Sequence, residues 1–377
     1  MMRPNQVGFE LTKACNYQCN YCFSSSGEPL RNELRLHEIQ RLLDEMYDLG
    51  FLFINFTGGE PVLRRDIFEI LEYTYNFGEA QIYHFQTNGT TWTKEFVDRF
   101  LKVLAKQPSL DVQISLDGYD RRSYVKARGG PPENFDRIIN LIATLKNHSI
   151  EINTLMTITK ASLPHAVKTA QFATQELEVD QFLMIPLFPA GRAISHFSEV
   201  EFSREVWKNF LIELTSIKRD ELWGEATRRM NAAFFNLYDL VLPLEEAGYQ
   251  KEIKAVWNFE EENFEDIYMR PTICEAAYTD IAVNSQGLVY PCTALIDSAL
   301  VAGNVRIEPL ESIWENSYCL NWFRTEATKV CEKEPCNSCS HKKVCGGGCR
   351  LSALELTGDP TGLDPRCPIV ASYLEAH

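Results

Sequence analysis

The sequence predicts an α/β protein with a parallel sheet, followed by a small cysteine-rich domain. Up to about residue 190, short apolar segments alternate with amphipathic ones, as strands and helices do along a parallel sheet. From residue 274 onward, nine of the twelve cysteines occupy barely a quarter of the chain. We therefore expect an α/β domain over residues 1–195, a helical bridge over 196–270 and a cysteine-rich domain over 271–377.

Six strands are expected in the first region, from apolar runs bounded by turn-forming or polar residues. They are Val7–Leu11, Phe51–Phe56, Gln81–Phe85, Val112–Leu116, Ile150–Ile158 and Gln181–Leu187. Helices lie between them, because apolar residues recur at steps of three and four from Leu36 to Leu49 and from Phe135 to Leu145. Six strand–helix units are two short of a full eight-fold barrel.

An unusual segment follows each predicted strand. In barrels of this kind, reactive groups gather at the C-terminal ends of the strands, so we expect these segments to converge there, at the mouth of the barrel. They are Cys15–Cys22, Thr57–Pro61, Thr87–Gly89, Ser115–Gly118, Thr157–Thr159 and Pro186–Arg192.

The first of these segments carries the spacing C-x3-C-x2-C at Cys15, Cys19 and Cys22. A loop this short can direct three thiolates at one point, where they can hold three irons of a four-iron cluster. The fourth iron then has no protein ligand and is free to bind a substrate or cofactor. A zinc site or buried thiols are the alternatives, but zinc requires four ligands, commonly from two C-x2-C pairs.

This loop resembles the signature of the radical S-adenosylmethionine (SAM) enzymes, and Gly58-Gly59-Glu60-Pro61 resembles their GGEP motif. The resemblance implies a partial (β/α)6 TIM-type barrel in which the open iron is chelated by the amino and carboxylate groups of SAM. It also implies that one electron from the cluster cleaves SAM to a 5′-deoxyadenosyl radical, which abstracts a hydrogen atom from the substrate.

The same resemblance implies a set of SAM-binding residues. These are Phe23, Gly58, Gly59, Glu60, Asn88, Ser115, Asp117 and Arg128. The GGEP motif would hold the methionine amino group, Ser115 or its neighbour would contact the ribose or carboxylate, and Arg128 would pair with the carboxylate. Phe23 would flank the adenine. The alternatives are turns at the glycines, Asn88, Ser115 and Asp117, a solvated charge at Arg128 and plain packing at Phe23. Gly191-Arg192-Ala193 matches a pattern of some family members and has no assigned role.

The predicted bridge carries no catalytic signature. Apolar residues from Val206 to Ile217 form one helical face, and those from Met230 to Val241 form a second. The acidic run Phe259–Asp266 is typical of a solvated face, and the alternative hypothesis is that it docks a basic segment of a peptide or partner.

The C-terminal cysteines follow the order C-x12-G-x4-C, C-x2-C-x5-C-x3-C and a final cysteine. The turn Asn284–Gly287 between two apolar runs predicts a hairpin that brings Cys274 and Cys292 together. Zinc is the main competitor here, but so many thiols without balancing histidines favour two iron–sulfur clusters.

This order resembles the seven-cysteine pattern of the SPASM domain, whose members carry two auxiliary four-iron clusters. By that resemblance, the first auxiliary cluster is held by Cys274, Cys292 and Cys349. The second is held by Cys336, Cys339, Cys345 and Cys367. Some relatives complete the first cluster with an extra cysteine shortly after its first ligand, and this chain has none between Cys274 and Cys292.

Two alternatives remain for the first auxiliary cluster: Cys331 supplies its fourth ligand, or one iron stays open for a substrate. We favour Cys331, because Cys319 lies in an apolar helical run typical of a buried structural thiol.

The two resemblances together imply an oxidoreductase that uses SAM and three [4Fe–4S] clusters. The auxiliary clusters would accept an electron from the substrate radical or bind the substrate. We expect the substrate to be a ribosomal peptide or protein that is crosslinked, excised or oxidised. The alternative is a small-molecule enzyme, for tetrapyrrole side-chain decarboxylation or sugar dehydrogenation. A non-catalytic iron–sulfur electron carrier is a third reading, and it leaves Gly58–Pro61 unexplained.

Composition adds expectations about partners. A net charge of −15 disfavours nucleic-acid binding. The sequence shows neither an apolar run long enough to span a membrane nor a signal peptide, so we expect a cytoplasmic protein. A flavodoxin- or ferredoxin-type reductant is expected. The chain starts almost at its first strand, so a leader-bearing peptide would require a separate recognition protein. Asp280 and Asp297 are unranked candidates for a proton acceptor.

Overall fold

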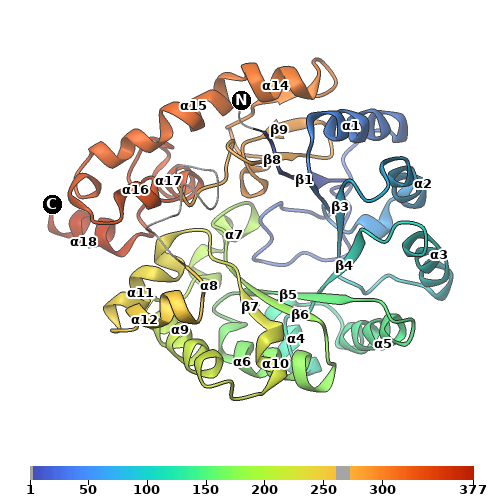
Figure 1. The fold of residues 1–377 in the computed structure, drawn as a ribbon, viewed down its shortest axis with the longest axis horizontal. Helices are drawn as coiled ribbons and strands as arrows, with labels where there is room; N and C mark the ends of the chain where they lie inside the picture. The colour runs from blue at the N-terminus through green and yellow to red at the C-terminus, as the bar shows by residue number, and fades with distance from the viewer. Residues whose placement is uncertain (1–2, 260–271) are drawn as a thin grey trace.

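A computed structural model describes residues 3–259 and 272–377 (Figure 1). Six parallel strands lie side by side in chain order, with helices around their outer side. They are β1 (Gln6–Glu10), β2 (Phe53–Thr57), β3 (Ile82–Thr87), β4 (Leu110–Ser115), β5 (Ile152–Ile158) and β6 (Gln181–Pro186). The six predicted strands are therefore confirmed, with small shifts at their ends.

The covering helices follow the predicted apolar periodicity. They are α1 (Leu36–Leu49), α2 (Ile67–Tyr73), α3 (Lys94–Leu104), α4 (Arg121–Arg128), α5 (Glu133–Asn147) and α6 (Leu163–Gln171). In α1 the apolar face formed by Ile39, Leu42, Leu43 and Met46 is buried. Gly50 ends this helix with a φ of 81°, a left-handed conformation that glycine adopts without strain. The predicted partial (β/α)6 barrel is confirmed.

The sheet continues beyond the barrel on both sides. A seventh strand, β7 (Met230–Ala232), pairs parallel to β6, and β8 (Asp280–Val283) pairs parallel to β1. The antiparallel strands β9 (Leu288–Tyr290) and β10 (Gly303–Asn304) follow, so that the described residues form one ten-stranded sheet. The predicted hairpin at Asn284–Gly287 is confirmed, and the cysteine-rich region is hydrogen-bonded to the barrel.

The bridge is less helical than expected. The short helix α7 (Arg192–Ser195) precedes it, and the helices in its described part are α8 (Phe197–Val200), α9 (Arg204–Arg219), α10 (Glu225–Arg229), α11 (Val241–Glu246) and α12 (Gln250–Ala255). The predicted helix from Met230 to Val241 is wrong. Its first residues form β7, because the edge of β6 offers backbone partners there. The Asp239 carboxylate then accepts hydrogen bonds from the backbone amides of Phe235 and Asn236, which starts a short 3-10 turn instead. The acidic run lies outside the described residues, apart from Phe259.

The C-terminal region consists of short elements. Its helices are α14 (Leu310–Asn316), α15 (Tyr318–Thr325), α16 (Lys342–Cys345), α17 (Arg350–Thr357) and α18 (Pro368–Ala376). The 3-10 or π turns of the chain are η1 (Pro61–Leu63), η2 (Thr74–Phe77), η3 (Phe172–Glu176), η4 (Leu237–Asp239), η5 (Thr293–Leu295), η6 (Ala327–Glu332) and η7 (Cys336–Ser338). Within 3–259 and 272–377, no helix combines the length and the apolar character needed to cross a membrane.

Candidate active site at the mouth of the barrel

The loop after β1 brings the three predicted cysteines together. Cys19 is buried, and Cys15 and Cys22 are half-buried. The pKa of Cys15 is raised to about 11, mainly by burial, with smaller contributions from the charges of Glu60, Cys19 and Cys22, while a backbone hydrogen bond from Tyr17 opposes the shift. The three thiols are therefore near neighbours in a site that disfavours bare thiolates, and a positively charged iron centre would reverse that balance.

The glycines of the GGEP segment let the loop after β2 lie directly against the cysteine loop. The backbone amides of Gly59 and Glu60 donate to the carbonyls of Thr12 and Ala14, each at 2.7 Å. A Cβ on Gly59 would lie only 2.1 Å from the Ala14 carbonyl oxygen. At Gly58 the φ of 142° is also one that other residues rarely adopt. Glycine is therefore required at both positions for this close approach.

Glu60 is buried below this contact. Its carboxylate accepts hydrogen bonds from the Thr87 hydroxyl at 2.6 Å and from the Asn88 amide at 2.7 Å. Burial raises the pKa of Glu60 to about 7, against the opposing effect of these hydrogen bonds. The Asn88 side-chain amide donates to the side-chain oxygen Oδ1 of Asn16 in the cysteine loop at 2.9 Å, so the ends of β2 and β3 both brace this loop.

Arg192, which sequence analysis left without a role, also holds the cysteine loop. Its guanidinium donates to the Cys19 carbonyl at 2.9 Å and to the Ser26 carbonyl at 2.7 Å, and its amide donates to the Cys22 carbonyl at 2.9 Å. The end of β6 therefore fixes the backbone on both sides of the last cysteine. The Gly-Arg-Ala pattern was the available signal, but a contact across so much sequence cannot be read from it.

The buried hydroxyl of Tyr21 links Asp117 and Arg128 at the mouth of the barrel. The Tyr21 hydroxyl donates to Asp117 at 2.6 Å, and Arg128 Nε lies 3.0 Å from both the Tyr21 hydroxyl and Asp117. The Arg128 side chain is 11% exposed, and its Nη1 atom is buried with no hydrogen-bond partner within the described residues. A buried guanidinium nitrogen without an acceptor has a strong preference for an anionic ligand. Tyr21, the aromatic residue directly before the last cysteine of the loop, was not among the predicted site residues.

Two further predicted residues lie at the same mouth. Ser115 ends β4 and is half-buried. Phe23 packs edge-on against Phe188, with ring centroids 6.3 Å apart, and its carbonyl oxygen would lie 2.2 Å from a Cβ on Gly191. The eight predicted SAM-binding residues thus all belong to segments that border the cysteine loop or the strand ends.

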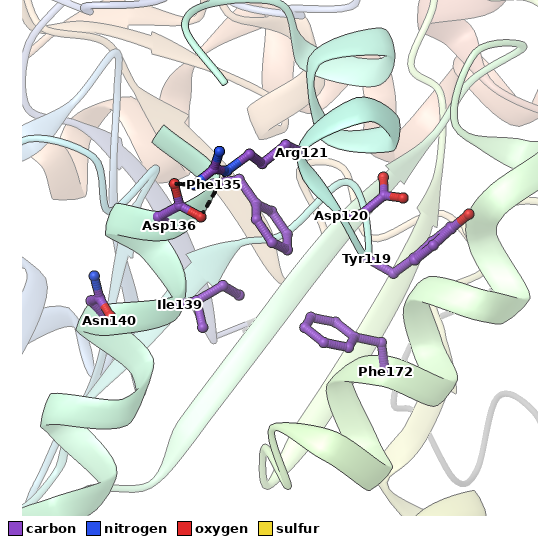
Figure 2. Close-up of a pocket in the computed structure, with 8 residues that line it drawn as sticks. All are labelled: Tyr119, Asp120, Arg121, Phe135, Asp136, Ile139, Asn140 and Phe172. Carbon is purple, nitrogen blue, oxygen red and sulfur yellow. Dashed lines mark hydrogen bonds and ion pairs between the residues drawn. The ribbon is translucent and has the colours of Figure 1, made fainter. Parts of the chain in front are cut away.

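A separate surface hollow lies between α4, α5 and η3 (Figure 2). Arg121 and Asp136 form an ion pair at 2.7 Å beside it, and Phe135, Ile139 and Phe172 provide an apolar wall. None of the cysteines or predicted SAM-binding residues lines this hollow. We therefore do not include it in the candidate active site.

Lys13 connects the cysteine loop to the C-terminal region. This buried side chain donates to the Ser24 carbonyl at 2.5 Å and forms ion pairs with Glu10 at 2.9 Å and with Asp297. Burial lowers the pKa of Lys13, but the two carboxylates overcome this effect and keep it raised. Sequence analysis listed Asp297 only as a possible proton acceptor and missed this contact.

The first C-terminal cysteine group follows the predicted hairpin. Burial raises the pKa of Cys292 well above its usual range, and the nearby charges of Asp280, Cys274 and Cys349 raise it further. The three cysteines therefore lie near one another, as predicted. The Cys349 amide donates to Asp364 at 2.8 Å, and Asp364 also accepts from the Tyr238 hydroxyl at 2.9 Å. Asp364 thus positions Cys349, a role for which the sequence offered no signal.

The second group surrounds a small cavity. Five thiols line this cavity: Cys331, Cys336, Cys339, Cys345 and Cys367. Burial raises the pKa of Cys336 to about 11 and that of Cys345 to about 12, and Cys331 and Cys367 add to both shifts. Our expectation that Cys331 completes the first group is therefore corrected, because the fold of η6 places its thiol with the second group. Cys319 is half-buried, away from both groups, and its thiol lies 3.5 Å from the Leu300 carbonyl.

The side chains fit iron–sulfur clusters better than single metal ions. Within the described residues, no three His, Cys, Asp or Glu side chains are close enough to hold one metal ion. In a four-iron cluster each thiolate binds a different iron, so its ligands lie further apart than those of a single ion. The all-thiol composition of all three groups agrees with this chemistry.

Comparison with known families identifies the class of protein. The radical SAM superfamily model matches residues 9–173, and the SPASM model, an iron–sulfur cluster-binding domain, matches residues 274–340. The chain belongs to the radical SAM enzymes with a C-terminal SPASM domain, whose cofactors are SAM and [4Fe–4S] clusters.

Its similarity to individual proteins spans nearly the whole chain. An AdoMet-dependent heme synthase of Methanosarcina barkeri is 27% identical over 97% of this chain and 96% of its own length. The mycofactocin maturase MftC of Mycolicibacterium smegmatis is 27% identical over 97% of this chain and 82% of its own length.

Among solved structures, Streptococcus suis SuiB bound to its precursor peptide SuiA matches with a TM-score of 0.76 at 20% identity, over 98% of this chain and 76% of that chain. AdoMet-bound anSMEcpe matches with a TM-score of 0.70 at 18% identity, over 99% of this chain and 96% of that chain. These two structures support the fold.

Proposed function

We propose that this enzyme modifies a ribosomally made peptide or protein by radical chemistry at the mouth of the barrel. When bound, SAM and the open cluster at Cys15, Cys19 and Cys22 supply a 5′-deoxyadenosyl radical that removes a hydrogen atom from the substrate. The observation that carries the SAM site is the buried Nη1 atom of Arg128 beside the cysteine loop, which has no hydrogen-bond partner among residues 3–259 and 272–377.

In this proposal the protein's own residues position SAM. Arg128 would receive the methionine carboxylate, and the Tyr21 and Asp117 partners keep its guanidinium in place. The GGEP segment, held against Thr12 and Ala14, would receive the amino group, with Glu60 as the buried acceptor. Ser115, Asn88 and Phe23 would border the ribose and adenine.

The C-terminal thiols would hold two auxiliary clusters. Cys274, Cys292 and Cys349 belong to the first, and Cys336, Cys339, Cys345 and Cys367 belong to the second. Cys331 lines the same cavity as these four cysteines and is therefore a further candidate ligand of the second cluster. The Lys13–Asp297 ion pair joins the two cofactor-bearing regions, and the auxiliary clusters would accept an electron from the substrate radical.

Peptide modification is supported by two relatives. One is a mycofactocin maturase, and the other, SuiB, has been solved with a precursor peptide bound. The second candidate is tetrapyrrole side-chain decarboxylation. It is favoured by the similarity to an AdoMet-dependent heme synthase, because the match covers 96% of the length of that relative. We propose a flavodoxin- or ferredoxin-type reductant, a separate leader-recognition protein and a cytoplasmic location, where thiols stay reduced for cluster assembly.

The first test asks whether the anaerobically reconstituted enzyme cleaves SAM. With dithionite, we expect 5′-deoxyadenosine by liquid chromatography, and Cys19→Ala should abolish it. Intact SAM, although the cluster at Cys15, Cys19 and Cys22 is fully loaded, would contradict the proposed chemistry.

The second test separates the two substrate classes. The enzyme is offered a precursor peptide encoded beside its gene, or a tetrapyrrole with propionate side chains, and deoxyadenosine formation is compared with mass spectra of the products. A peptide that loses hydrogen supports maturation. A tetrapyrrole that loses carbon dioxide, with the peptide unchanged, would favour the second candidate instead.

A further inference from the structure

Because Cys331 lies with the second cysteine group, the first auxiliary cluster has no fourth ligand among the cysteines predicted for it. Its group contains three cysteines, Cys274, Cys292 and Cys349, whereas Cys331 lies with the second group. A four-iron cluster normally takes one protein ligand for each iron. Another anionic side chain close to these three cysteines could complete the ligand set.

Asp280 faces Cys292 across the hairpin. In the antiparallel pair β8–β9, Ala282 lies opposite Tyr290 and Val283 lies opposite Val289. Continuing this register by one side-chain repeat places Asp280 opposite Cys292. Directly opposed residues point to the same face of a sheet, with Cβ atoms about 4.5–5.5 Å apart. The Ala277 amide donates to both the Asp280 and the Pro291 carbonyls at 2.9 Å, which closes the end of the hairpin around this pair.

The charge environment agrees with this register. Asp280 is buried, with 7% of its surface exposed. After burial itself, its charge is the largest influence that raises the pKa of Cys292, ahead of the charges of Cys274 and Cys349. A carboxylate beside three thiolates makes this site strongly anionic, and an iron centre is the kind of positive charge that such a site binds. Glu275, the residue after Cys274, is exposed and therefore fits this role less well.

We propose that Asp280 is the fourth protein ligand of the first auxiliary cluster and binds the iron that Cys274, Cys292 and Cys349 leave open. This inference rests on the auxiliary clusters of the proposed function. A carboxylate oxygen is a harder ligand than a thiolate and suits this iron less well. A substrate thiolate would displace it by exchange of one anionic ligand for another, with no electron transferred. The Asp280 position would then be the substrate-binding corner of the auxiliary cluster.

The test isolates the two auxiliary clusters by removing the SAM-binding cluster of the barrel. The parent for all variants is the full chain with Cys15→Ala, Cys19→Ala and Cys22→Ala, reconstituted anaerobically. It should bind about eight irons, as two four-iron clusters. Iron and sulfide content, Mössbauer spectra and electron paramagnetic resonance (EPR) of the dithionite-reduced protein are then compared among variants.

Asp280→Ala and Asp280→Asn should change one cluster and leave the other intact. We expect the loss of between about one and about four irons and the loss or shift of one of the two EPR signals. Asp280→Cys should restore the iron with a shifted signal, and Glu275→Gln, the matched control beside Cys274, should leave the parent spectra unchanged. Unchanged iron and spectra in both Asp280→Ala and Asp280→Asn would overturn the proposal.

A second measurement needs no substitution at Asp280. The parent is labelled with 13C at the aspartate carboxyl carbons, and electron–nuclear double resonance is recorded on each reduced cluster. A strong 13C coupling to one cluster is expected, and its absence from both clusters would overturn the assignment of Asp280. If the parent itself binds no iron–sulfur cluster, the proposed function fails rather than this inference.

Discussion

The two cysteine-bearing regions of this enzyme are held in different ways. The loop of Cys15, Cys19 and Cys22 is braced by backbone and side-chain groups from the ends of β2, β3 and β6, far apart in sequence. Among the cysteines of the second C-terminal group, Cys336 and Cys345 instead lie in the short elements η7 and α16, and Cys339 and Cys367 lie at the ends of η7 and α18. The first site is therefore preformed by the barrel, whereas we expect the second region to depend on its clusters for much of its order, because metal binding is coupled to folding in such segments.

The largest expected effect tests the bracing of the first loop. Gly59→Ala would place a Cβ against the Ala14 carbonyl and displace the loop. Because misplacement by about 1 Å costs about 100-fold in rate, we expect at least that loss of SAM cleavage, measured as deoxyadenosine formed. Gly27→Ala is the matched control in the same loop, since its Cβ would meet open space, and it should retain activity. Equal activity in both variants would contradict a preformed loop.

Removal of iron should affect the order of the two regions differently. After anaerobic chelation, we expect hydrogen exchange to rise by at least about tenfold in residues 327–367, while the strands β1 to β6 remain protected. Mass spectrometry of peptic fragments measures both regions in one sample. Equal loss of protection in the barrel and in the C-terminal region would remove the distinction drawn above.

A smaller effect is expected at Arg128. Arg128→Gln removes the charge beside Tyr21 and Asp117, and we expect about a tenfold weaker SAM affinity, because a charge-assisted hydrogen bond is lost. Isothermal titration of the cluster-loaded protein measures this change. Arg121→Gln, at the exposed ion pair with Asp136, is the control and should bind SAM normally. Normal affinity in Arg128→Gln would show that SAM is held without this side chain.

The smallest effect concerns a second ion pair between the barrel and the C-terminal region, formed by Glu38 of α1 and Arg306. Arg306 Nε lies 2.7 Å from Glu38, and this hydrogen bond lowers the pKa of Glu38 to about 2 from its usual 4.5. The stabilisation is therefore complete above about pH 4.5 and is lost as pH falls toward 2. Glu38→Gln should cost about 1 kcal/mol of unfolding free energy at neutral pH and flatten this acid dependence in denaturant titrations. Glu326→Gln, at the local pair with Lys329, should have no measurable effect.

Much of the barrel could be predicted because its signals are local. Apolar runs locate each strand, and Gly50 ends α1 where the apolar periodicity stops. The spacing of the cysteines and the GGEP segment also identified the mouth of the barrel. These features depend on residues close together in the sequence, and the family comparison agrees with them.

The errors arose where distant contacts decide the structure. The segment from Met230 has helical spacing, but the edge of β6 captures it as β7. Cys331 was assigned by elimination, whereas the path of η6 decides which cysteine group it joins. Arg192 contacts the cysteine loop from the segment after β6, more than 160 residues further along the chain, and no local pattern reveals this contact. Asp280 became a candidate ligand only once the β8–β9 register was known.

The parallel pairing of β8 with β1 has a consequence for how such enzymes can be divided. Without residues 272–377, the first strand of the barrel would become an edge, with its amides and carbonyls exposed. An exposed edge of this kind recruits strands from other molecules, so an excised barrel should aggregate rather than act as a minimal enzyme. The barrel and residues 272–377 must therefore be inherited and expressed together.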